Sequence, residues 1–414
     1  MKQKIIDNIH DPDILEALYR ENRQEFSKAF AEVSETVDTE LVKFWKIRLA
    51  PERVKEAAGF NRRDLIIVLL LSLVTGLLVK LPAIFCGIHE EAFYKRDLAI
   101  IIFNGIILYT FWQSRSFTGK RLMFYGAVML VMLLFVNFLP YSASDSIVLS
   151  FIHIPLFLWC LFGLVFIGFD FQVIGKRISF IRFNGELLIM MGLILIAGGI
   201  LAAVTMGLFH AIKMDIEKFY FDWVVTMGAA AIPIVAFYLL RLYPNITNRL
   251  APVIAIVFTP LVLITLAVYL TVMLVSTDKL LADRNLLILF NAMLLGVMVI
   301  IVFSVSELDK LKEKNFNVLV LFLLALLAIV INGIALMAIT SRVLTGLTPN
   351  RTIVLVSNIL IFVNLILIAK NLFLSWFRRN PIERVEEVVA RYLTVYTAWT
   401  LIVIFVLPFV FRFR

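Results

Sequence analysis

Cysteine, histidine and charged residues are all scarce in this 414-residue chain. Its two cysteines, Cys86 and Cys160, exclude a disulfide framework and a metal site built from cysteines. The four histidines include no pair at i, i+4 spacing, so a histidine metal site lacks local support and we expect no cofactor. Charged residues make up only 17% of the chain, against roughly 25% in soluble domains. The chain is therefore too apolar for a soluble protein.

Catalytic motifs are absent as well. The sequence contains no HExxH, no Walker-type GxxxxGK[ST], no GxSxG and no CxxC pair. The Asp and Glu residues of the connecting segments are isolated and form no evident carboxylate pair. Since residues of distant helices can still meet in space, the sequence does not exclude an enzyme, but it gives no support for one.

Long apolar blocks dominate the chain instead. Hydrophobic residues make up 61% of it, in stretches near the roughly 20 residues that a spanning helix needs. Barrel strands would alternate over about 9–11 residues, which these blocks do not do. We therefore predict an all-α polytopic transmembrane bundle of eleven spans, at 65–86, 98–113, 122–139, 147–169, 187–209, 223–240, 253–275, 286–305, 318–340, 352–374 and 392–411. The span at 98–113 is the weakest, because it is short and lies between charged ends.

The first 64 residues form a different, strongly charged segment that holds 25 charged positions. We predict a cytoplasmic helical segment at 1–64 and a transmembrane domain at 65–414. Asp11-Pro12-Asp13 is a good helix start, because Pro suits the first helical position and Asp caps free amides. Apolar residues then recur near helical spacing, at Leu15, Leu18, Phe26, Phe30, Val33, Val37, Leu41 and Phe44. The pattern predicts one or two amphipathic helices that continue through Trp45 to a break at Pro51.

The distribution of basic residues predicts the orientation. With eleven spans, the loops on the N-terminal side hold 19 Lys and Arg residues, and the opposite loops hold 10. The positive-inside rule then places the N-terminus in the cytoplasm and the C-terminus outside. The net charge of +9 reflects this orientation, so we expect no nucleic-acid partner. No short apolar stretch with a cleavage site begins the sequence, so we expect no signal peptide.

Polar groups inside the spans are the best pointers to function, because burying them in hydrocarbon is costly. His153 lies two residues before Pro155, which can kink its helix; it is a proton-responsive or ligand-contacting group, or a neutral histidine bonded to a neighbouring helix. Glu186 follows Asn184 and Gly185 at the expected start of the fifth span. There it caps the helix, where the macrodipole favours an anion, or else it contacts a substrate or proton.

Asparagines near the middle of two consecutive spans, Asn332 and Asn364, form the other candidate ligand or proton site. We expect them to lie close together. Ser357, Asn364 and Asn371 repeat every seven residues and give their span one polar stripe. Interhelical hydrogen bonds explain such a stripe, and a hydrated pathway is the functional alternative.

Three further sequence patterns predict local structure or contacts. Small residues line the fifth span and predict close helix packing, at Gly192, Gly198, Gly199, Ala202, Ala203 and Gly207. Thr348 and Pro349 make a good helix start, and Arg351 falls in the first turn, where the dipole disfavours a cation unless an anion accompanies it. Arg351 is therefore a candidate anion contact, with a protein carboxylate or a lipid phosphate as its partner. The segment 378–391 forms either a short interfacial helix or a turn that begins the last span.

Three stretches resemble the bacterial membrane family catalogued as domain of unknown function 4153. They are the Thr-Pro-Asn-Arg run at 348–351, the Phe-Asn-Gly-Glu entry at 183–186, and the stretch from Gly228 to Pro233. The run at 11–20 is similar to the leader of some members. The resemblance implies a multipass protein of the bacterial inner (plasma) membrane, and it brings no catalytic or ligand residues with it.

Two functions remain open on the sequence. The first is a transporter or lipid-handling protein with a site among the central helices, favoured by the many spans, the Pro and Gly interruptions and the buried polar groups. The second is a sensor, scaffold or assembly factor that contacts a cytoplasmic protein through residues 1–60. A membrane-embedded enzyme would need carboxylate, histidine and basic groups together in one cavity.

Overall fold

The computed structural model of the chain describes most of its residues. The described ranges are 2–9, 11–21, 26, 29–30, 33, 39, 41–42, 44–45, 61–85, 89–114, 118–140, 144–211, 213–275, 284–308, 314–378 and 380–413. The chain divides into two compact units, Met1–Phe60 and Asn61–Arg414. This division falls four residues before the change in composition at Asp64.

The N-terminal unit contains two described helices, α1 (Lys2–Asp7) and α2 (Pro12–Glu21). The helix start at Asp11-Pro12 is confirmed: Pro12 begins α2, and the Asp11 carboxylate accepts the backbone N–H of Ile14 at 3.1 Å. The unit has its own core, made by Ile5, Ile9, Leu15, Leu18, Phe26, Phe30, Val33, Val42 and Trp45. The expectation for Phe44 is wrong, because its ring is 53% exposed while the adjacent Trp45 is buried. Val37 and the break at Pro51 lie outside the described residues.

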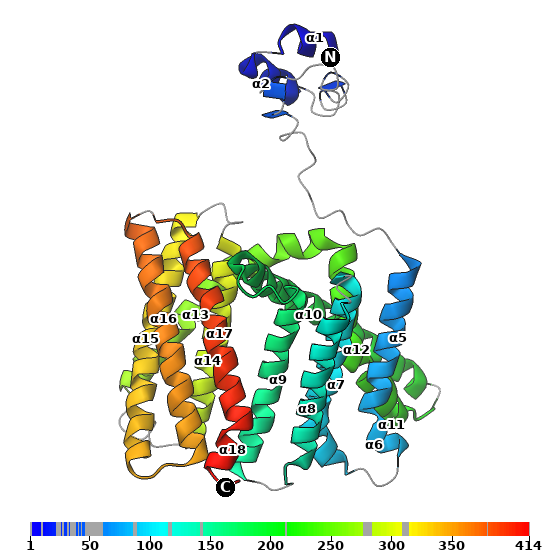
Figure 1. The fold of residues 1–414 in the computed structure, drawn as a ribbon, viewed down its shortest axis with the longest axis vertical. Coiled ribbons are helices and arrows are strands. Elements are labelled where there is room, and N and C mark those ends of the chain that lie inside the picture. Colours follow the sequence, from blue (N-terminus) through cyan, green and yellow to red (C-terminus); the bar gives the residue numbers. More distant parts are fainter. Residues whose placement is uncertain are drawn as a thin grey trace. The chain divides into compact units, whose positions relative to one another are not determined.

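The second unit is a bundle of helices, and the described residues contain no strand. Its helices are α5 (Arg62–Val79), α6 (Leu81–Ile84), α7 (Glu90–Ser114), α8 (Gly119–Phe138), α9 (Asp145–Phe166), α10 (Ile174–Ala211), α11 (Glu217–Phe219), the π-helix η1 (Tyr220–Val225), α12 (Thr226–Leu242), α13 (Pro244–Val275), α14 (Arg284–Glu307), α15 (Lys314–Leu344), α16 (Pro349–Arg378), α17 (Glu383–Phe405) and α18 (Leu407–Val410). The predicted all-α polytopic bundle is confirmed (Figure 1).

A helix lies over each of the eleven predicted spans. Within the described part of the chain, nine helices are long and apolar enough to cross a membrane. The other two ranges belong to α5, whose first turn holds Arg62, Arg63 and Asp64, and to α14, whose described apolar part is the shorter stretch Met293–Glu307. The span at 98–113, weakest in the sequence, belongs to the 25-residue helix α7 and is long enough to cross.

Two hydrophobic cores hold the bundle together. The first lies among α5, α7, α8, α9 and α12, and the second among α13, α14, α15 and α16. Figure 1 shows these groups on opposite sides of the bundle. Two helices enter both cores: α10 gives Phe180 to the first and Ile181 to the second, and α17 gives Ile404 to the first and Val385 to the second. Thus α10 and α17 form the seam between the two groups.

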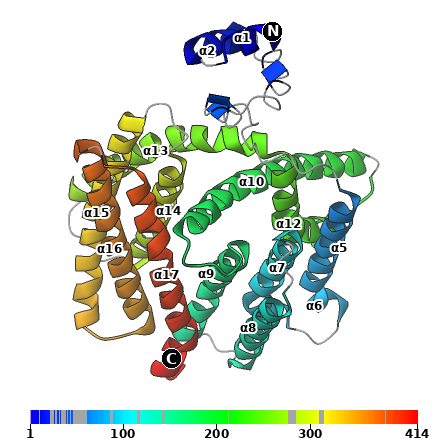
Figure 2. The same ribbon diagram turned by 45° about the horizontal axis from the view of Figure 1, so that its top comes forward.

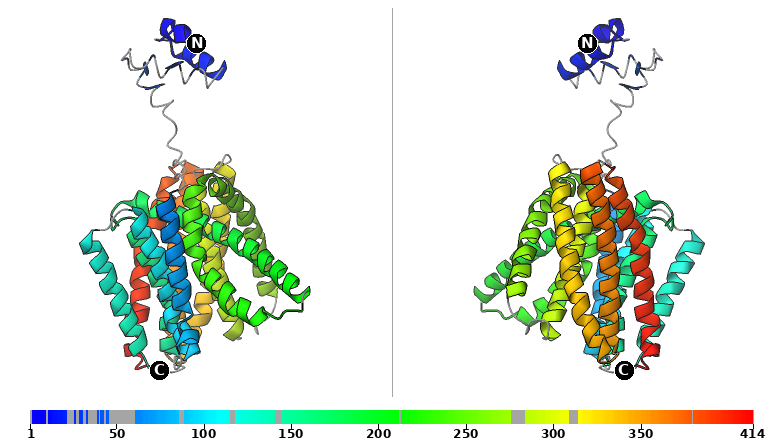
Figure 3. Two further views of the ribbon diagram at one scale, coloured as in Figure 1. Left: turned by 90° about the vertical axis from the view of Figure 1, so that its right-hand side faces the viewer. Right: turned by 90° about the vertical axis from the view of Figure 1, so that its left-hand side faces the viewer.

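Helix α10 differs from the others in length and exposure. It contains 38 residues and crosses obliquely between the two groups (Figure 2). Of the 18 consecutive residues in its most apolar stretch, only 11% are buried inside the protein. The side views show its C-terminal part and the segment that follows leaning away from the other helices (Figure 3).

The predicted close packing along the small residues of α10 is wrong. A Cβ built on Gly192, Gly198, Gly199 or Gly207 meets no atom of the described residues within 4 Å. The close approach occurs instead at Gly185, where a Cβ would lie 2.1 Å from the ring of Phe303 on α14. Glycine is therefore required at 185, because any side chain would push α10 and α14 apart.

Candidate functional site

A polar cluster lies on the seam, where α10, α14 and α17 meet. The Arg182 guanidinium of α10 forms an ion pair with the Glu386 carboxylate of α17, with an N–O distance of 2.6 Å. The same guanidinium donates through Nε to the carbonyl oxygen of Ser306 on α14. The Glu386 side chain is 5% exposed and that of Arg182 is 28% exposed. One arginine therefore connects three helices within a largely buried site.

The local sequence explains how each group reaches this position. Glu386 lies in the first turn of α17, where the partial positive charge of the helix start favours a carboxylate. Its neighbours Val385 and Val389 are buried and fix the orientation of this turn. On α10, Arg177 donates to the backbone oxygen of Ala390, a second polar link between α10 and α17. A further carboxylate, that of Glu307 beside Ser306, is fully buried at the end of α14.

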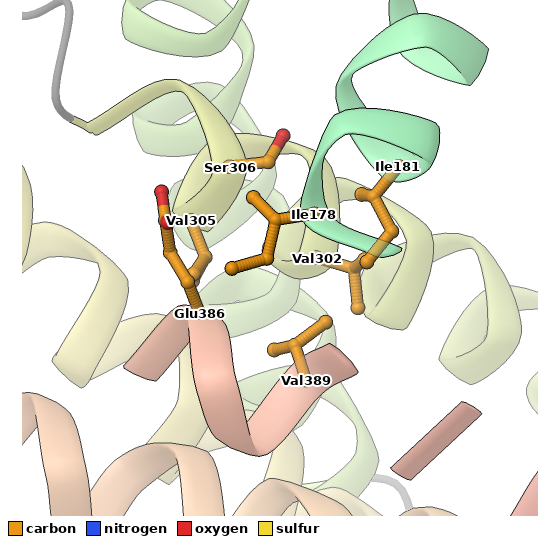
Figure 4. Close-up of a pocket in the computed structure, with 7 residues that line it drawn as sticks. All are labelled: Ile178, Ile181, Val302, Val305, Ser306, Glu386 and Val389. Atoms are coloured by element: carbon orange, nitrogen blue, oxygen red, sulfur yellow. The ribbon is translucent and has the colours of Figure 1, made fainter. Parts of the chain in front are cut away.

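A shallow, nearly filled pocket adjoins this ion pair. Figure 4 shows its aliphatic side chains converging from three helices, with the Glu386 carboxylate at the edge. The lining residues are Ile178, Ile181, Val302, Val305, Ser306, Glu386 and Val389. The pocket leaves no room for the centre of a water molecule. The side chains of the seam are thus tightly packed beside a buried pair of opposite charges.

Glu186 lies one turn from this cluster, but not at a helix start. Helix α10 begins at Ile174, so the prediction that Glu186 opens the span and caps it is wrong. The charged stretch 174–186 stays helical because Ile178 and Ile181 pack against α14 and α17 on one face. Glu186 is half-buried and has interactions with its surroundings.

His153 is buried in α9, with 9% of its surface exposed. Its Nδ1 lies 2.8 Å from the carbonyl oxygen of Leu149, one turn earlier in the same helix. Pro155 lies inside α9 without ending it. The ring therefore bonds within its own helix, which is neither a contact with a neighbouring helix nor, within the described residues, part of a cluster of titratable groups.

Asn332 and Asn364 lie on helices that pack side by side, but they bond to different partners. Asn332 Nδ2 donates to the backbone oxygen of Asn358 at 3.1 Å, and Asn358 in turn donates to Asn291 of α14 at 2.9 Å. Asn364 donates to the hydroxyl of Tyr396 on α17 at 3.0 Å. The two asparagines therefore have separate hydrogen-bond partners, and their grouping in one site stays a prediction.

The polar stripe of α16 faces α17 for most of its length. The Trp399 indole donates to the Ser357 hydroxyl at 2.9 Å, next to the bond from Asn364 to Tyr396, whereas Asn371 donates to the Leu367 carbonyl of its own helix. Interhelical hydrogen bonding thus accounts for Ser357 and Asn364. Within the part of the chain that the structure describes, the amide oxygens of Asn332 and Asn364 are nevertheless buried without a hydrogen-bond partner, an arrangement that costs about 1–3 kcal/mol each.

Arg351 makes its contacts with the end of the preceding helix. Its guanidinium donates to the carbonyl oxygens of Arg342 and Gly346, at 2.8 and 2.9 Å, and to the hydroxyl of Thr345. These contacts lie at the negative end of the α15 dipole, which a cation stabilises, and the anion contact expected for Arg351 stays a prediction. The predicted cap is confirmed, because Thr348 accepts the backbone N–H of Arg351 at 3.3 Å.

A second charged cluster ties α5, α7 and α12 together. Asp64 accepts from the Trp112 indole at 3.0 Å and lies 3.7 Å from the Arg241 guanidinium, which also donates to Gln113. This pairing accounts for the carboxylate at the start of α5, whereas Arg62 and Arg63 are exposed. Among the described residues, no three His, Cys, Asp or Glu side chains gather to hold a metal ion.

The sequence did not single out Arg182, Glu307 or Glu386 as candidate site residues. The available signal was the stripe Val385, Val388, Val389 and Tyr392, which continues directly into the last span. Helix α17 runs unbroken from Glu383 to Phe405, so the alternative in which 378–391 begins the last span is correct and the separate interfacial helix is wrong.

Comparison of the chain with protein-family models, curated proteins and solved structures finds no match.

Proposed function

We propose that this multipass membrane protein is a transporter that moves a small solute or a lipid, and that its two helix groups rearrange about the α10–α17 seam. The observation that carries the proposal is the buried Arg182–Glu386 pair on the two helices that enter both cores. Charges buried inside membrane bundles are expensive and mark ion, proton or substrate pathways. Alternating access requires two bodies that move against each other, and the two separate cores provide two such bodies. The ion pair lies toward one end of the seam between them, in the first turn of α17.

The closed pocket beside Glu386 represents one end state in this proposal. Its aliphatic walls from α10, α14 and α17 separate when the ion pair opens, and the buried Glu307 then joins Glu386 as a second carboxylate on the opened path. The proposal also includes the location, the orientation and the family that the sequence predicts. The protein lies in the bacterial inner membrane with its N-terminus in the cytoplasm and its C-terminus outside, as a member of the family that its motifs at 183–186 and 348–351 resemble.

Single-cysteine labelling tests the moving seam without knowledge of the substrate. Replacing Cys86 and Cys160 by alanine gives a cysteine-free chain, into which Val389→Cys, in the pocket wall, is introduced. We expect a membrane-impermeant maleimide to label this position slowly, and faster after Glu386→Gln, because the weakened pair leaves the seam open more often. Ala325→Cys is the matched control, since Ala325 is fully buried inside the second core and should stay unlabelled.

Transport itself is measured in proteoliposomes. A fluorescent phospholipid that dithionite quenches reports lipid movement, and osmotic swelling with a panel of solutes reports solute entry. Movement above that of protein-free vesicles, reduced by Glu386→Gln or Arg182→Met, supports the proposal. The proposal is refuted if Val389→Cys stays unlabelled both with Glu386 and with Glu386→Gln, and if neither lipid nor solute moves.

A second function is favoured by one observation, the separate core of the N-terminal unit. Phe26, Phe30 and Trp45 pack together there, with ring centroids 5.1–6.1 Å apart. Since this unit is compact by itself, it can bind a cytoplasmic protein and pass a signal to or from the bundle. Crosslinking followed by pull-down, with the full chain and with residues 1–60 deleted, tests this function. An unchanged set of crosslinked partners after the deletion counts against it.

A further inference from the structure

A pocket of about 400 Å³ lies on the surface where α10 gives way to α11 and η1. Its lining combines two acids, one base and two aromatic rings, from Asp215, Lys218, Phe219, Asp222 and Trp223. The volume falls in the range of about 300–1,000 Å³ that is typical of small-molecule sites. Part of the wall is a π-helix, a rare element that often occurs at functional sites.

The charged groups of this pocket are available for a ligand. Within the described residues, Lys218 and Asp222 form neither an ion pair nor a hydrogen bond, although they lie one helical turn apart. Asp215 uses one carboxylate oxygen to accept the backbone N–H of Glu217. The pocket therefore offers carboxylates and an ammonium group that are separate from each other, which matches a ligand carrying both signs of charge.

The indole of Trp223 is held in place from the other side. The Lys80 ammonium, at the end of α5, lies 5.6 Å from its ring centroid, within the range of a cation–π contact. Lys80 is only 7% exposed, so this contact is sheltered from solvent. It fixes the ring as one wall of the pocket and places a second positive charge behind it.

The surroundings of the pocket resemble a membrane–water interface. Aromatic residues follow one another from Phe219 to Trp223, as is common at the level of lipid headgroups. The helix that leads into the pocket, α10, exposes a continuous apolar surface, with Ile200, Leu201, Val204 and Leu208 each more than half exposed. Acyl chains can lie along this surface because the glycines at 198, 199 and 207 face open space.

We propose that this pocket, the α11 pocket, binds the headgroup of a zwitterionic phospholipid that carries an ammonium and a phosphate, such as phosphatidylethanolamine. The ammonium lies between Asp215 and Asp222, the phosphate pairs with Lys218, and the acyl chains follow the exposed face of α10. This assignment gives a lipid class to the proposed lipid-handling function. It rests on that function only in requiring that the protein lies in a bilayer.

Native mass spectrometry of the full chain in detergent tests the α11 pocket, with phosphatidylethanolamine and phosphatidylglycerol of identical acyl chains as probes. The two lipids share the phosphate and differ in the ammonium. We expect the chain to retain phosphatidylethanolamine roughly five- to tenfold better than phosphatidylglycerol. The reason is that its ammonium makes two contacts with exposed carboxylates that phosphatidylglycerol cannot make. Asp222→Asn should remove this preference, and Lys218→Gln should weaken the binding of both lipids.

Glu217→Gln is the matched control, since Glu217 lies five residues before Asp222, carries the same charge and does not line the pocket. It should leave the preference unchanged, and all three variants should unfold at the temperature of the unaltered chain because the altered side chains are exposed. Equal retention of the two lipids by the unaltered chain overturns the proposal, and so does an equal loss of preference in Glu217→Gln. Retention of soluble phosphoethanolamine as strong as that of phosphatidylethanolamine overturns the lipid assignment, because the acyl chains would then contribute nothing. None of these outcomes alters cysteine labelling at residue 389, so a failure here is distinct from a failure of the transport proposal.

Discussion

Breaking the ion pair at the seam should destabilise the protein unequally, depending on which partner is removed. Arg182→Met leaves the Glu386 carboxylate, 5% exposed, without its counter-charge, which costs about 3–5 kcal/mol for a buried pair. Glu386→Leu leaves the Arg182 guanidinium, which is 28% exposed and keeps its bond to the Ser306 carbonyl. Because that cation still reaches water, we expect a smaller loss of about 1–3 kcal/mol.

The double substitution should recover part of the loss, because neither charge then remains buried. An apolar pair of similar volume often replaces a buried ion pair with little cost. The coupling energy between the two positions should therefore reach about 2–3 kcal/mol. Glu387 and Arg391 on the same helix provide the control pair: they lie 2.5 Å apart, but their side chains are 39% and 68% exposed. Their coupling should be only about 0.3–0.5 kcal/mol.

The measurement is reversible unfolding in mixed micelles, with increasing sodium dodecyl sulfate, followed by tryptophan fluorescence. Each single variant, each double variant and the unaltered chain give a free energy of unfolding, and two double-mutant cycles result. Simple additivity of the two losses at 182 and 386, or a coupling no larger than that of the exposed control pair, would refute the reasoning. A larger loss for Glu386→Leu than for Arg182→Met would contradict the assignment of Glu386 as the more deeply buried charge.

Three further substitutions test particular contacts. Gly185→Ala forces a Cβ against the Phe303 ring and should cost about 1–3 kcal/mol, whereas Gly192→Ala meets open space and should be neutral or slightly stabilising; thermal unfolding of the two variants separates them. Asn332→Leu removes one hydrogen bond together with an unpartnered oxygen, so stability in the same assay should change by less than about 1 kcal/mol, and a much larger loss would mean that the amide has a partner. Arg351→Gln should loosen the turn after α15, since its guanidinium binds three oxygens there, and hydrogen exchange at 343–347 should rise while exchange in the middle of α15 stays constant.

The architecture could be predicted because its main signal is local. A run of about 20 apolar residues has few alternatives to a spanning helix, so the eleven ranges each coincide with a helix. Helix lengths were harder to predict, as α10 shows. Hydropathy indicates only which residues hydrocarbon surrounds, but the helix begins earlier and includes the charged stretch 174–186. Packing faces were harder still. The small residues of α10 have the pattern of a helix–helix contact, yet the contact forms at Gly185, where the partner ring of Phe303 is more than a hundred residues away.

The candidate site was only partly predictable for a similar reason. Asn332 and Asn364 are conspicuous because they interrupt apolar spans, and both prove to be buried. Arg182 and Glu386 are separated by 204 positions, and each lies in a charged stretch that resembles an ordinary loop. Only the fold brings them together. The contacts of Arg351 with the end of α15 could not be predicted, because backbone carbonyls at a helix end carry partial negative charge without appearing in the sequence as an acid.

The seam also has a consequence for biosynthesis. A ribosome that adds about 5–20 residues per second needs roughly ten to forty seconds to advance the 204 positions from Arg182 to Glu386. During this interval the arginine waits in the membrane without its carboxylate, near an interface where water and lipid phosphates can shield it. The second core also lacks Val385 and Val389 until α17 inserts. Nascent chains stalled before α17 should therefore be the form that membrane proteases and insertases recognise, and release from them should coincide with the arrival of one helix.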